Sequence, residues 1–428
     1  MTRSKRIAVV GGGAAGMLAA LAASNAGQHA TLFERNKRLG IKILISGGGK
    51  CNITHNAPPR QMEEGFIRPE ARFLRYAFHT LTSESLLSML HAEGVETFVR
   101  PNGRVFPVSG SADDVLSAFE RMLQRARVQV ETNAHVQAIL VENGAAVGIQ
   151  LDGQAVRFDA VVVATGGVSY RKVGTTGDGI AWGESLGLPV VPLRAALAPI
   201  YFTPAPHASW QGVALRDVRL TFAPTLNQLG IPNAKDFNQT WRDDLLLTHR
   251  GASGPATLEI SRAVALAQEA GATPILLADV APDQRPEELL DIFLDRLQNS
   301  PISEIQTFVS GFVPQAIVES VLEQAGIEPG RKLGAIRRHE RGQIVATLKR
   351  WRVGTVGQIP IDRGEVTAGG IALSAVDPTT MRSRAIPNLY FAGEALDVAG
   401  RVGGYNLQAA FSTGWVAGRA AAINPEEA

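Results

Sequence analysis

Three glycines near the N-terminus have a spacing that can bind a phosphate-bearing ligand. They form the pattern Gly11-x-Gly13-x-x-Gly16, and Glu34 ends the apolar run that comes next. Gly11 permits a tight turn, Gly13 lets a pyrophosphate approach the backbone, and Gly16 lets the following helix pack closely. A helix N-terminus offers free N–H groups to phosphates, and a carboxylate at position 34 accepts hydrogen bonds from ribose hydroxyls. The pattern predicts a dinucleotide site and disfavours a ribose 2′-phosphate.

The elements needed to position these residues surround them. Residues 5–10 have the length of a strand, residues 17–26 of a helix and residues 29–33 of a second strand. Residues 7–23 contain no polar side chain and follow three basic residues, which taken alone resembles a signal peptide or a short membrane span. Because glycines early in this run would weaken a membrane helix, we favour strand, turn and helix and expect no membrane span.

Three distant segments indicate a longer cofactor than a nicotinamide dinucleotide. They are a glycine-rich loop at 46–56, a strand ending in Ala-Thr-Gly-Gly at 158–167, and a strand running into Gly-Glu at 389–394. A nicotinamide-only domain would continue with another strand–helix unit where the 46–56 loop stands. The order of these segments predicts FAD, held in one domain that is built from both ends of the chain.

At this point the sequence resembles the two-dinucleotide-binding-domain flavoproteins. It is most similar to a bacterial family that includes aminoacetone oxidases and reductases of dehydrated bile-acid intermediates. The similarity rests on the motifs SGGGKCNIT (46–54), GRVFPVS (103–109), LLLTHRGASGP (245–255), VTAGGI (366–371) and LYFAGEALD (389–397). The resemblance implies an α/β fold: a Rossmann-like, glutathione-reductase-like FAD-binding domain with an inserted β-barrel-like substrate domain and a small helical subdomain.

The resemblance also implies where each part of FAD binds. The 46–54 loop wraps the ribityl chain and flavin, Glu394 lies on the ribityl chain, and the helix at Asn406 points at the flavin N1–C2 edge. A helix N-terminus there would stabilise the negative charge of reduced flavin. The expected cofactor-binding residues are Gly11, Gly13, Ala14, Ala15, Gly16, Glu34, Arg35, Lys42, Ser46, Gly47, Gly48, Lys50, Cys51, Asn52, Thr54, Val136, Ala164, Thr165, Gly166, Gly177, Asp178, Gly370, Gly393, Glu394, Gly404, Asn406 and Leu407.

The middle of the chain carries no dinucleotide motif. We expect residues 1–190 and 362–428 to form the FAD-binding domain, residues 191–280 and 351–361 a β-rich substrate domain, and residues 281–350 a helical subdomain. The basic stretch 331–341 has helical spacing and contains Glu340, so we interpret it as a solvated helix face.

Composition excludes several classes of partner and site. The net charge of +2 is too nearly balanced to indicate nucleic acid as the main partner. Cys51 is the only cysteine, which rules out an intramolecular disulfide and a two-cysteine redox pair and makes a cysteine-ligated metal site implausible. We therefore expect a cytoplasmic protein without a metal.

The flavin would carry the electron transfer, so the protein need supply positioning and proton management. The candidate catalytic residues are Tyr405, Arg250, His249 and Tyr170, and no single one is favoured. Cys51 is interpreted as a packed loop residue, His55 as either structural or functional, and Asp397 as a cap of its local turn.

The expected function is that of an FAD-dependent oxidoreductase acting on a small organic substrate. We favour a reductase of a carbonyl or conjugated compound that uses NAD(P)H. The alternatives are an oxygen-dependent amine oxidase that produces hydrogen peroxide and a non-catalytic, flavin-binding regulatory protein. Because the chain has one glycine-rich dinucleotide motif, NAD(P)H would have to enter the substrate cleft itself.

Overall fold

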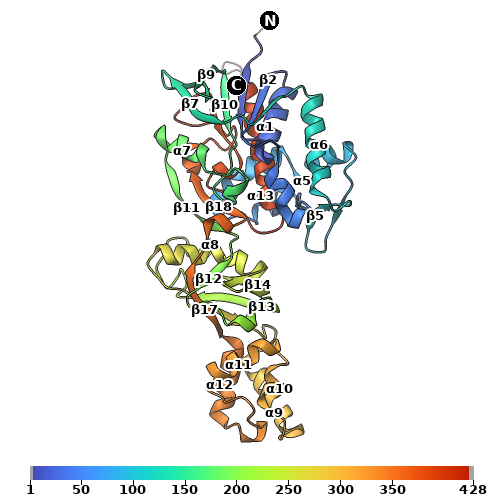
Figure 1. The fold of residues 1–428 in the computed structure, drawn as a ribbon, viewed down its shortest axis with the longest axis vertical. Coiled ribbons are helices and arrows are strands. Elements are labelled where there is room, and N and C mark those ends of the chain that lie inside the picture. The colour runs from blue at the N-terminus through green and yellow to red at the C-terminus, as the bar shows by residue number, and fades with distance from the viewer. Residues whose placement is uncertain (1–2, 424–428) are drawn as a thin grey trace. The chain divides into compact units, whose positions relative to one another are not determined.

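The computed structural model describes residues 3–423, and the chain forms two units, each described by itself (Figure 1). Both ends of the chain build the first unit, up to Arg194 and from Glu365, and Ala195–Gly364 build the second. The bounds predicted for three separate domains stay a prediction.

The centre of the first unit is a five-stranded parallel sheet. Its strands, in spatial order, are β19 (Leu389–Phe391), β10 (Ala160–Val163), β1 (Arg6–Val10), β2 (His29–Glu34) and β6 (Gln129–Thr132). β1 pairs in parallel with both β10 and β2, so that Val9 lies opposite Val162 and Leu32. Every residue of β10 is buried, as expected for a parallel strand covered on both faces.

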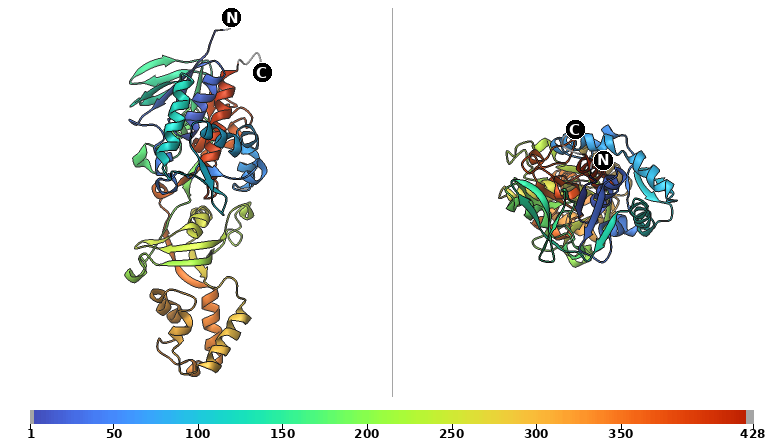
Figure 2. Two further views of the ribbon diagram at one scale, coloured as in Figure 1. Left: turned by 90° about the vertical axis from the view of Figure 1, so that its right-hand side faces the viewer. Right: turned by 90° about the horizontal axis from the view of Figure 1, so that it is seen from above.

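Two helices from opposite ends of the chain pack against each other in this unit. They are α1 (Ala14–Asn25) and α13 (Tyr405–Ala422), which lie side by side (Figure 2). A Cβ on Gly414 would lie 2.1 Å from the carbonyl oxygen of Ala15, and one on Gly418 would lie 2.0 Å from that of Ala19. Only glycine allows this approach, so the two ends of the chain share one core.

The apolar run at 7–23 is divided between β1, a turn and α1. Within residues 3–423, the structure contains no helix with the length and apolar character needed to cross a membrane.

Smaller elements surround the central sheet. A sheet of β3, β5 and β4 and a sheet of β7, β8 and β9 are each antiparallel, and β11 pairs with β18. The bounds are α2 (Ile41–Ile45), β3 (Thr54–His55), α3 (Pro59–Glu63), α4 (Arg68–Thr80), α5 (Ser83–Ala92), β4 (Thr97–Val99), β5 (Arg104–Pro107), α6 (Ala112–Arg125), β7 (Val136–Glu142), β8 (Ala145–Leu151), β9 (Gln154–Arg157), α7 (Asp178–Ser185), β11 (Val190–Ala196) and β18 (Val366–Ile371).

The second unit contains a closed barrel of six strands. In spatial order these are β12 (Ile200–Phe202), β15 (Gly251–Ser253), β14 (Thr240–Leu247), β13 (Ala214–Ala223), β16 (Ile275–Asp279) and β17 (Trp351–Gln358). Helix α8 (Pro255–Glu269) packs on β13 and β14, and begins with proline at its first turn. The sequence interpretation did not include this helix, although Pro255 and the apolar spacing after it are typical start signals.

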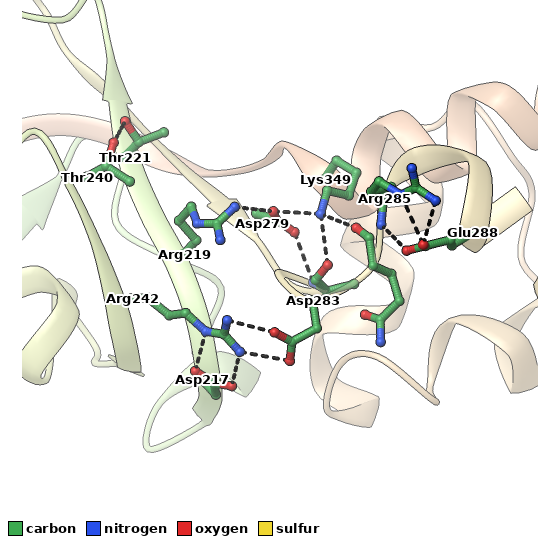
Figure 3. A network of polar contacts seen from close by, with 12 residues as sticks. Asp217, Arg219, Thr221, Thr240, Arg242, Asp279, Asp283, Arg285, Glu288 and Lys349 are labelled. Atoms are coloured by element: carbon green, nitrogen blue, oxygen red, sulfur yellow. Dashed lines mark hydrogen bonds and ion pairs between the residues drawn. The ribbon is translucent and has the colours of Figure 1, made fainter.

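Four further helices join the barrel through one hydrophobic core. They are α9 (Pro286–Asn299), α10 (Ile305–Val309), α11 (Gln315–Gln324) and α12 (Arg338–Lys349). At the junction, Lys349 Nζ lies 2.7 Å from an Asp279 carboxylate oxygen and donates to the carbonyls of Ala281 and Gln284 (Figure 3). Nearby, Arg242 bridges Asp217 and Asp283, at 2.7 Å from each.

The parallel sheet of the first unit and the closed barrel of the second confirm the predicted fold class. It is a Rossmann-type α/β domain with an inserted barrel and helices.

One interpretation of this region was wrong. The basic stretch 331–341 is not a continuous helix face, because α12 begins only at Arg338. Arg331 instead forms two hydrogen-bonded contacts with Glu340, at 2.8 and 2.9 Å, and the backbone N–H of Arg337 donates to the same carboxylate. These contacts hold the pKa of Glu340 down at about 2. The stretch 331–341 thus consists of two parts, the segment before α12 and the capped first turn of α12.

Candidate cofactor and active site

The glycine turn between β1 and α1 forms an open cradle. Gly11 has φ 107°, and a Cβ there would lie 2.5 Å from the carbonyl oxygen of Ala164. A Cβ on Gly16 would lie 1.8 Å from the carbonyl oxygen of Gly11. By contrast, among the described residues a Cβ on Gly13 would meet no atom within 4 Å, and none of their side chains caps the N-terminus of α1. The first turn of α1 is thus open in the way a bound pyrophosphate requires.

Glu34 lies at the end of β2 and is 8% exposed. One carboxylate oxygen accepts from the backbone N–H of Gly12 at 2.7 Å, and the other accepts from the Asn36 backbone and side-chain amides at 2.8 and 2.7 Å. Since a carboxylate offers about four acceptor positions, one is left for a ribose hydroxyl. Glu34 therefore braces the glycine turn as well. Sequence reasoning missed Asn36, whose only signal is its place two residues after the carboxylate.

Arg35 links the end of β2 to the start of α7. Its guanidinium lies 2.8 Å from the Asp178 carboxylate and also donates to Thr176. Gly177, with φ 83°, caps α7, and Thr165 accepts a hydrogen bond from the backbone N–H of Gly179. The structure thus brings together four residues of the predicted cofactor set from three separate segments.

A second polar cluster joins four segments of the chain around Glu394. Lys42 Nζ lies 2.6 Å from one Glu394 carboxylate oxygen and 2.9 Å from Ser169 Oγ. The other oxygen accepts from Ser169 Oγ at 3.0 Å and from the backbone N–H of Thr367 at 2.8 Å. The Lys42 and Glu394 side chains stay 26% and 17% exposed, so both can still reach a ligand. Sequence reasoning did not find Ser169 or Thr367 as parts of this cluster.

The 46–54 loop contacts the start of α13. Gly47 and Gly48 have φ of 57° and 68°, which glycine adopts without strain. In the amide orientation that pairs donors with acceptors, Asn52 accepts from the backbone N–H of Gly404 at 2.9 Å. Gly404 itself approaches so closely that a Cβ would lie 2.3 Å from the carbonyl carbon of Thr54. No side chain within residues 3–423 caps α13, so its N-terminus is open beside this loop.

The remaining predicted residues also belong to the first unit. Asn406 accepts from the backbone N–H of Gly400 at 2.8 Å and donates to its carbonyl at 3.0 Å, so it fixes the loop before α13. A Cβ on Gly370 would lie 2.7 Å from the carbonyl oxygen of Ala395, and one on Gly393 would lie 2.8 Å from the Cβ of Ala15. For all the expected cofactor-binding residues, contact with FAD stays a prediction. These residues include Ala14, Ser46, Lys50, Val136, Gly166 and Leu407.

Cys51 is fully buried, and burial raises the pKa of its thiol to about 12, although Ser46 opposes this shift. The thiolate is the reactive form of cysteine. The environment therefore favours the packing role over a redox role.

We expect Cys51 to resist alkylation in the native protein. At about pH 8, only about one thiol in 10⁴ would be ionised, and none is accessible. Iodoacetamide should label the protein in concentrated urea but not in buffer, as mass spectrometry would show. Cys51→Ser should retain flavin reduction. Rapid native labelling, or a hundredfold slower reduction with FAD still bound, would contradict the packing role.

Two aromatic rings mark the start of α13. His55 stacks on Tyr405 with centroids 4.6 Å apart and an interplanar angle of 19°, and its Nδ1 lies 3.2 Å from the carbonyl oxygen of Gly403. Burial lowers the pKa of His55, the Gly403 carbonyl opposes this, and the nearby charge of Arg104 lowers it further. The imidazole is therefore neutral near pH 7, and it positions Tyr405.

The other candidate catalytic residues belong to different units of the chain. Tyr170 precedes a short 3₁₀ turn with φ 55° in the first unit. His249 and Arg250 belong to the second unit and are exposed, and the Arg250 guanidinium lies 3.9 Å above the Tyr201 ring. Asp397 accepts from the backbone N–H of Gly369 at 2.8 Å, as a turn-bracing residue does. A catalytic role for any of the four candidates stays a prediction.

The residues of this site fit a dinucleotide that has a charged pyrophosphate and a ring that becomes anionic on reduction. The open space at Gly13 suits a pyrophosphate, the remaining acceptor of Glu34 suits a ribose, and the uncapped start of α13 suits an anionic ring edge. Within residues 3–423, no group of three or more histidine, cysteine, aspartate or glutamate side chains is placed to hold a metal ion.

One family model and two known proteins match this chain along nearly its whole length. The family described as HI0933-like protein Rossmann domain matches residues 5–420. A 3-dehydro-bile acid delta(4,6)-reductase of Clostridium scindens is 30% identical over 98% of this chain and 100% of its own. A ribosomal RNA dihydrouridine synthase of Escherichia coli is 30% identical over 95% of both chains.

Among solved structures, two steroid-converting enzymes share the fold. A 3-ketosteroid delta1-dehydrogenase from Sterolibacterium denitrificans superposes with a TM-score of 0.53 at 13% identity, covering 98% of this chain and 100% of its own. A 3-ketosteroid-delta4-(5alpha)-dehydrogenase from Rhodococcus jostii superposes with a TM-score of 0.51 at 16% identity, covering 99% and 98%. At these identities the likeness establishes the fold alone.

Proposed function

The chain belongs to the HI0933-like family of FAD-binding Rossmann proteins, and we propose that this FAD-dependent oxidoreductase reduces a carbon–carbon double bond conjugated to a carbonyl group. The observation that carries the proposal is the end-to-end similarity to the bile-acid reductase. Its name describes reduction of double bonds in conjugation with a 3-oxo group. The second relative forms dihydrouridine, which is also reduction of a double bond next to a carbonyl. A conjugated carbonyl compound is therefore the substrate class that both relatives support.

Bound FAD, once reduced by the electron donor, would supply the hydride for this reduction. The chain's own residues would hold the cofactor. The glycine turn and Glu34 would bind the pyrophosphate and ribose, and the Lys42–Glu394 pair would hold the ribityl chain. The open start of α13 would stabilise negative charge on the reduced ring.

We propose NAD(P)H as the electron donor. Because the chain has one glycine-rich dinucleotide motif, the donor and the organic substrate would use the same cleft in turn. That arrangement gives ping-pong kinetics. We also propose a cytoplasmic location, which rests on the single cysteine.

Anaerobic mixing of the oxidised holoenzyme with NADH, NADPH or aminoacetone tests the donor. Loss of flavin absorbance with a nicotinamide, followed by its return on adding a 3-oxo-4,6-diene steroid, is the expected result. Bleaching by aminoacetone, and hydrogen peroxide in air, would instead establish the amine oxidase. Sequential kinetics would contradict the shared cleft.

A second candidate substrate follows from the Escherichia coli relative. Uridine in ribosomal RNA would undergo the same conjugate reduction. The nearly balanced charge of the chain favours the small molecule, so we place RNA second. Dihydrouridine formed in unmodified ribosomal RNA, with no reaction of the steroid, would reverse this order.

A further inference from the structure

A half-buried arginine lies beside the start of α13. Arg104 is the first residue of β5 and pairs directly with His55 of β3, so the two side chains share one face of this sheet. A Cβ placed on Gly403 would lie 3.6 Å from both Arg104 Nε and His55 Nδ1. The guanidinium is therefore adjacent to the backbone that leads into α13.

In the part of the chain that the structure describes, no hydrogen bond or ion pair engages the Arg104 guanidinium. Its hairpin neighbour Arg100 differs, because Arg100 lies 4.1 Å above the Phe106 ring. His55 uses Nδ1 on the carbonyl of Gly403, and an imidazole carries no negative charge, so His55 does not neutralise Arg104.

The positive charge of Arg104 interacts with the carboxyl group of Glu365. Desolvation raises the pKa of Glu365, and the charges of Arg104 and Lys42 oppose that shift. Nevertheless, Arg104 and Glu365 form no ion pair within 4 Å in the described chain. A half-buried guanidinium that no described residue engages by a hydrogen bond or an ion pair is suited to bind a ligand oxygen.

We propose that Arg104 binds the carbonyl oxygen of the unsaturated substrate, an inference that rests on the proposed function. Hydride from the bound, reduced cofactor bonds to the β-carbon and breaks the carbon–carbon π bond. Its electron pair forms an enolate with negative charge on the carbonyl oxygen, and a proton from solvent then bonds to the α-carbon. Donors that meet this oxygen bind it more tightly as the charge develops, so they accelerate the step.

The test compares holoenzyme variants on one hairpin. Arg104→Gln removes the charge, Arg104→Lys keeps it, and Arg100→Gln is the matched control. Each protein is reduced anaerobically and mixed with the 3-oxo-4,6-diene steroid while flavin reoxidation is followed. The midpoint potential of each substrate-free enzyme and its affinity for 4-chlorophenolate, a planar oxyanion, are measured separately by absorbance.

We expect Arg104→Gln to slow reoxidation by about 10²-fold. It should weaken phenolate binding at least tenfold, with FAD content and midpoint potential unchanged. Arg104→Lys should recover part of both losses, and Arg100→Gln should match the wild type.

Two kinds of failure are distinguishable. If the wild-type enzyme is not reoxidised by the steroid but binds phenolate through Arg104, the proposed substrate is wrong and the oxyanion site stands. If phenolate binds wild type and Arg104→Gln equally, or binds neither, the inference is overturned. A changed midpoint potential in substrate-free Arg104→Gln would also overturn it, because the arginine would then act on the cofactor.

Discussion

Replacement of Gly13 by alanine is expected to weaken FAD binding by about tenfold to a hundredfold while changing the unfolding free energy of the apoprotein by less than about 1 kcal/mol. The reason is that a Cβ at this position meets no atom of the described chain within 4 Å. The space is left for the pyrophosphate, so the added methyl group would contact only the ligand.

Gly16→Ala provides the matched comparison three residues later. Its Cβ would lie 1.8 Å from the carbonyl oxygen of Gly11, so α1 would have to move away from β1. We expect a loss of about 3 kcal/mol or more in apoprotein stability, together with loss of FAD. Urea unfolding of the apoprotein and fluorescence titration with FAD separate the two effects. If Gly13→Ala binds FAD like wild type, the pyrophosphate does not lie over this turn.

Glu34→Ala is expected to weaken FAD binding by about 1.5–3 kcal/mol, which is roughly tenfold to more than a hundredfold. Part of this loss arises from the ribose contact. Part arises from the turn, because the backbone N–H groups of Gly12 and Asn36 lose their acceptor.

The two contributions can be measured apart. The turn contribution should appear as lower apoprotein stability, and the ribose contribution as additional loss only when FAD is present. Glu131→Ala is the control, since Glu131 lies opposite Phe33 on the adjacent strand β6. Unchanged FAD affinity in Glu34→Ala would remove the ribose assignment.

Local chemistry determined the parts of this protein that could be predicted from residue order. A strand, a turn with positive φ and a helix leave a readable pattern of apolar runs and glycines, so β1, α1 and β2 were predicted within a few residues. The fold class, the cofactor and the family followed because the motifs at 46–54, 164–167 and 389–394 each carry such a pattern.

Tertiary structure alone decided which distant side chains meet. The Lys42, Ser169, Thr367 and Glu394 cluster draws on four segments, and Arg104 approaches Gly403 across about 300 residues of chain. The periodicity of apolar residues specifies which face of a helix or strand is buried, but it does not specify which other element packs against that face. The partners of Glu34 and Glu394, and the lack of a hydrogen-bond or ion-pair partner for the Arg104 guanidinium among residues 3–423, therefore became visible only when both ends of the chain had packed into one core.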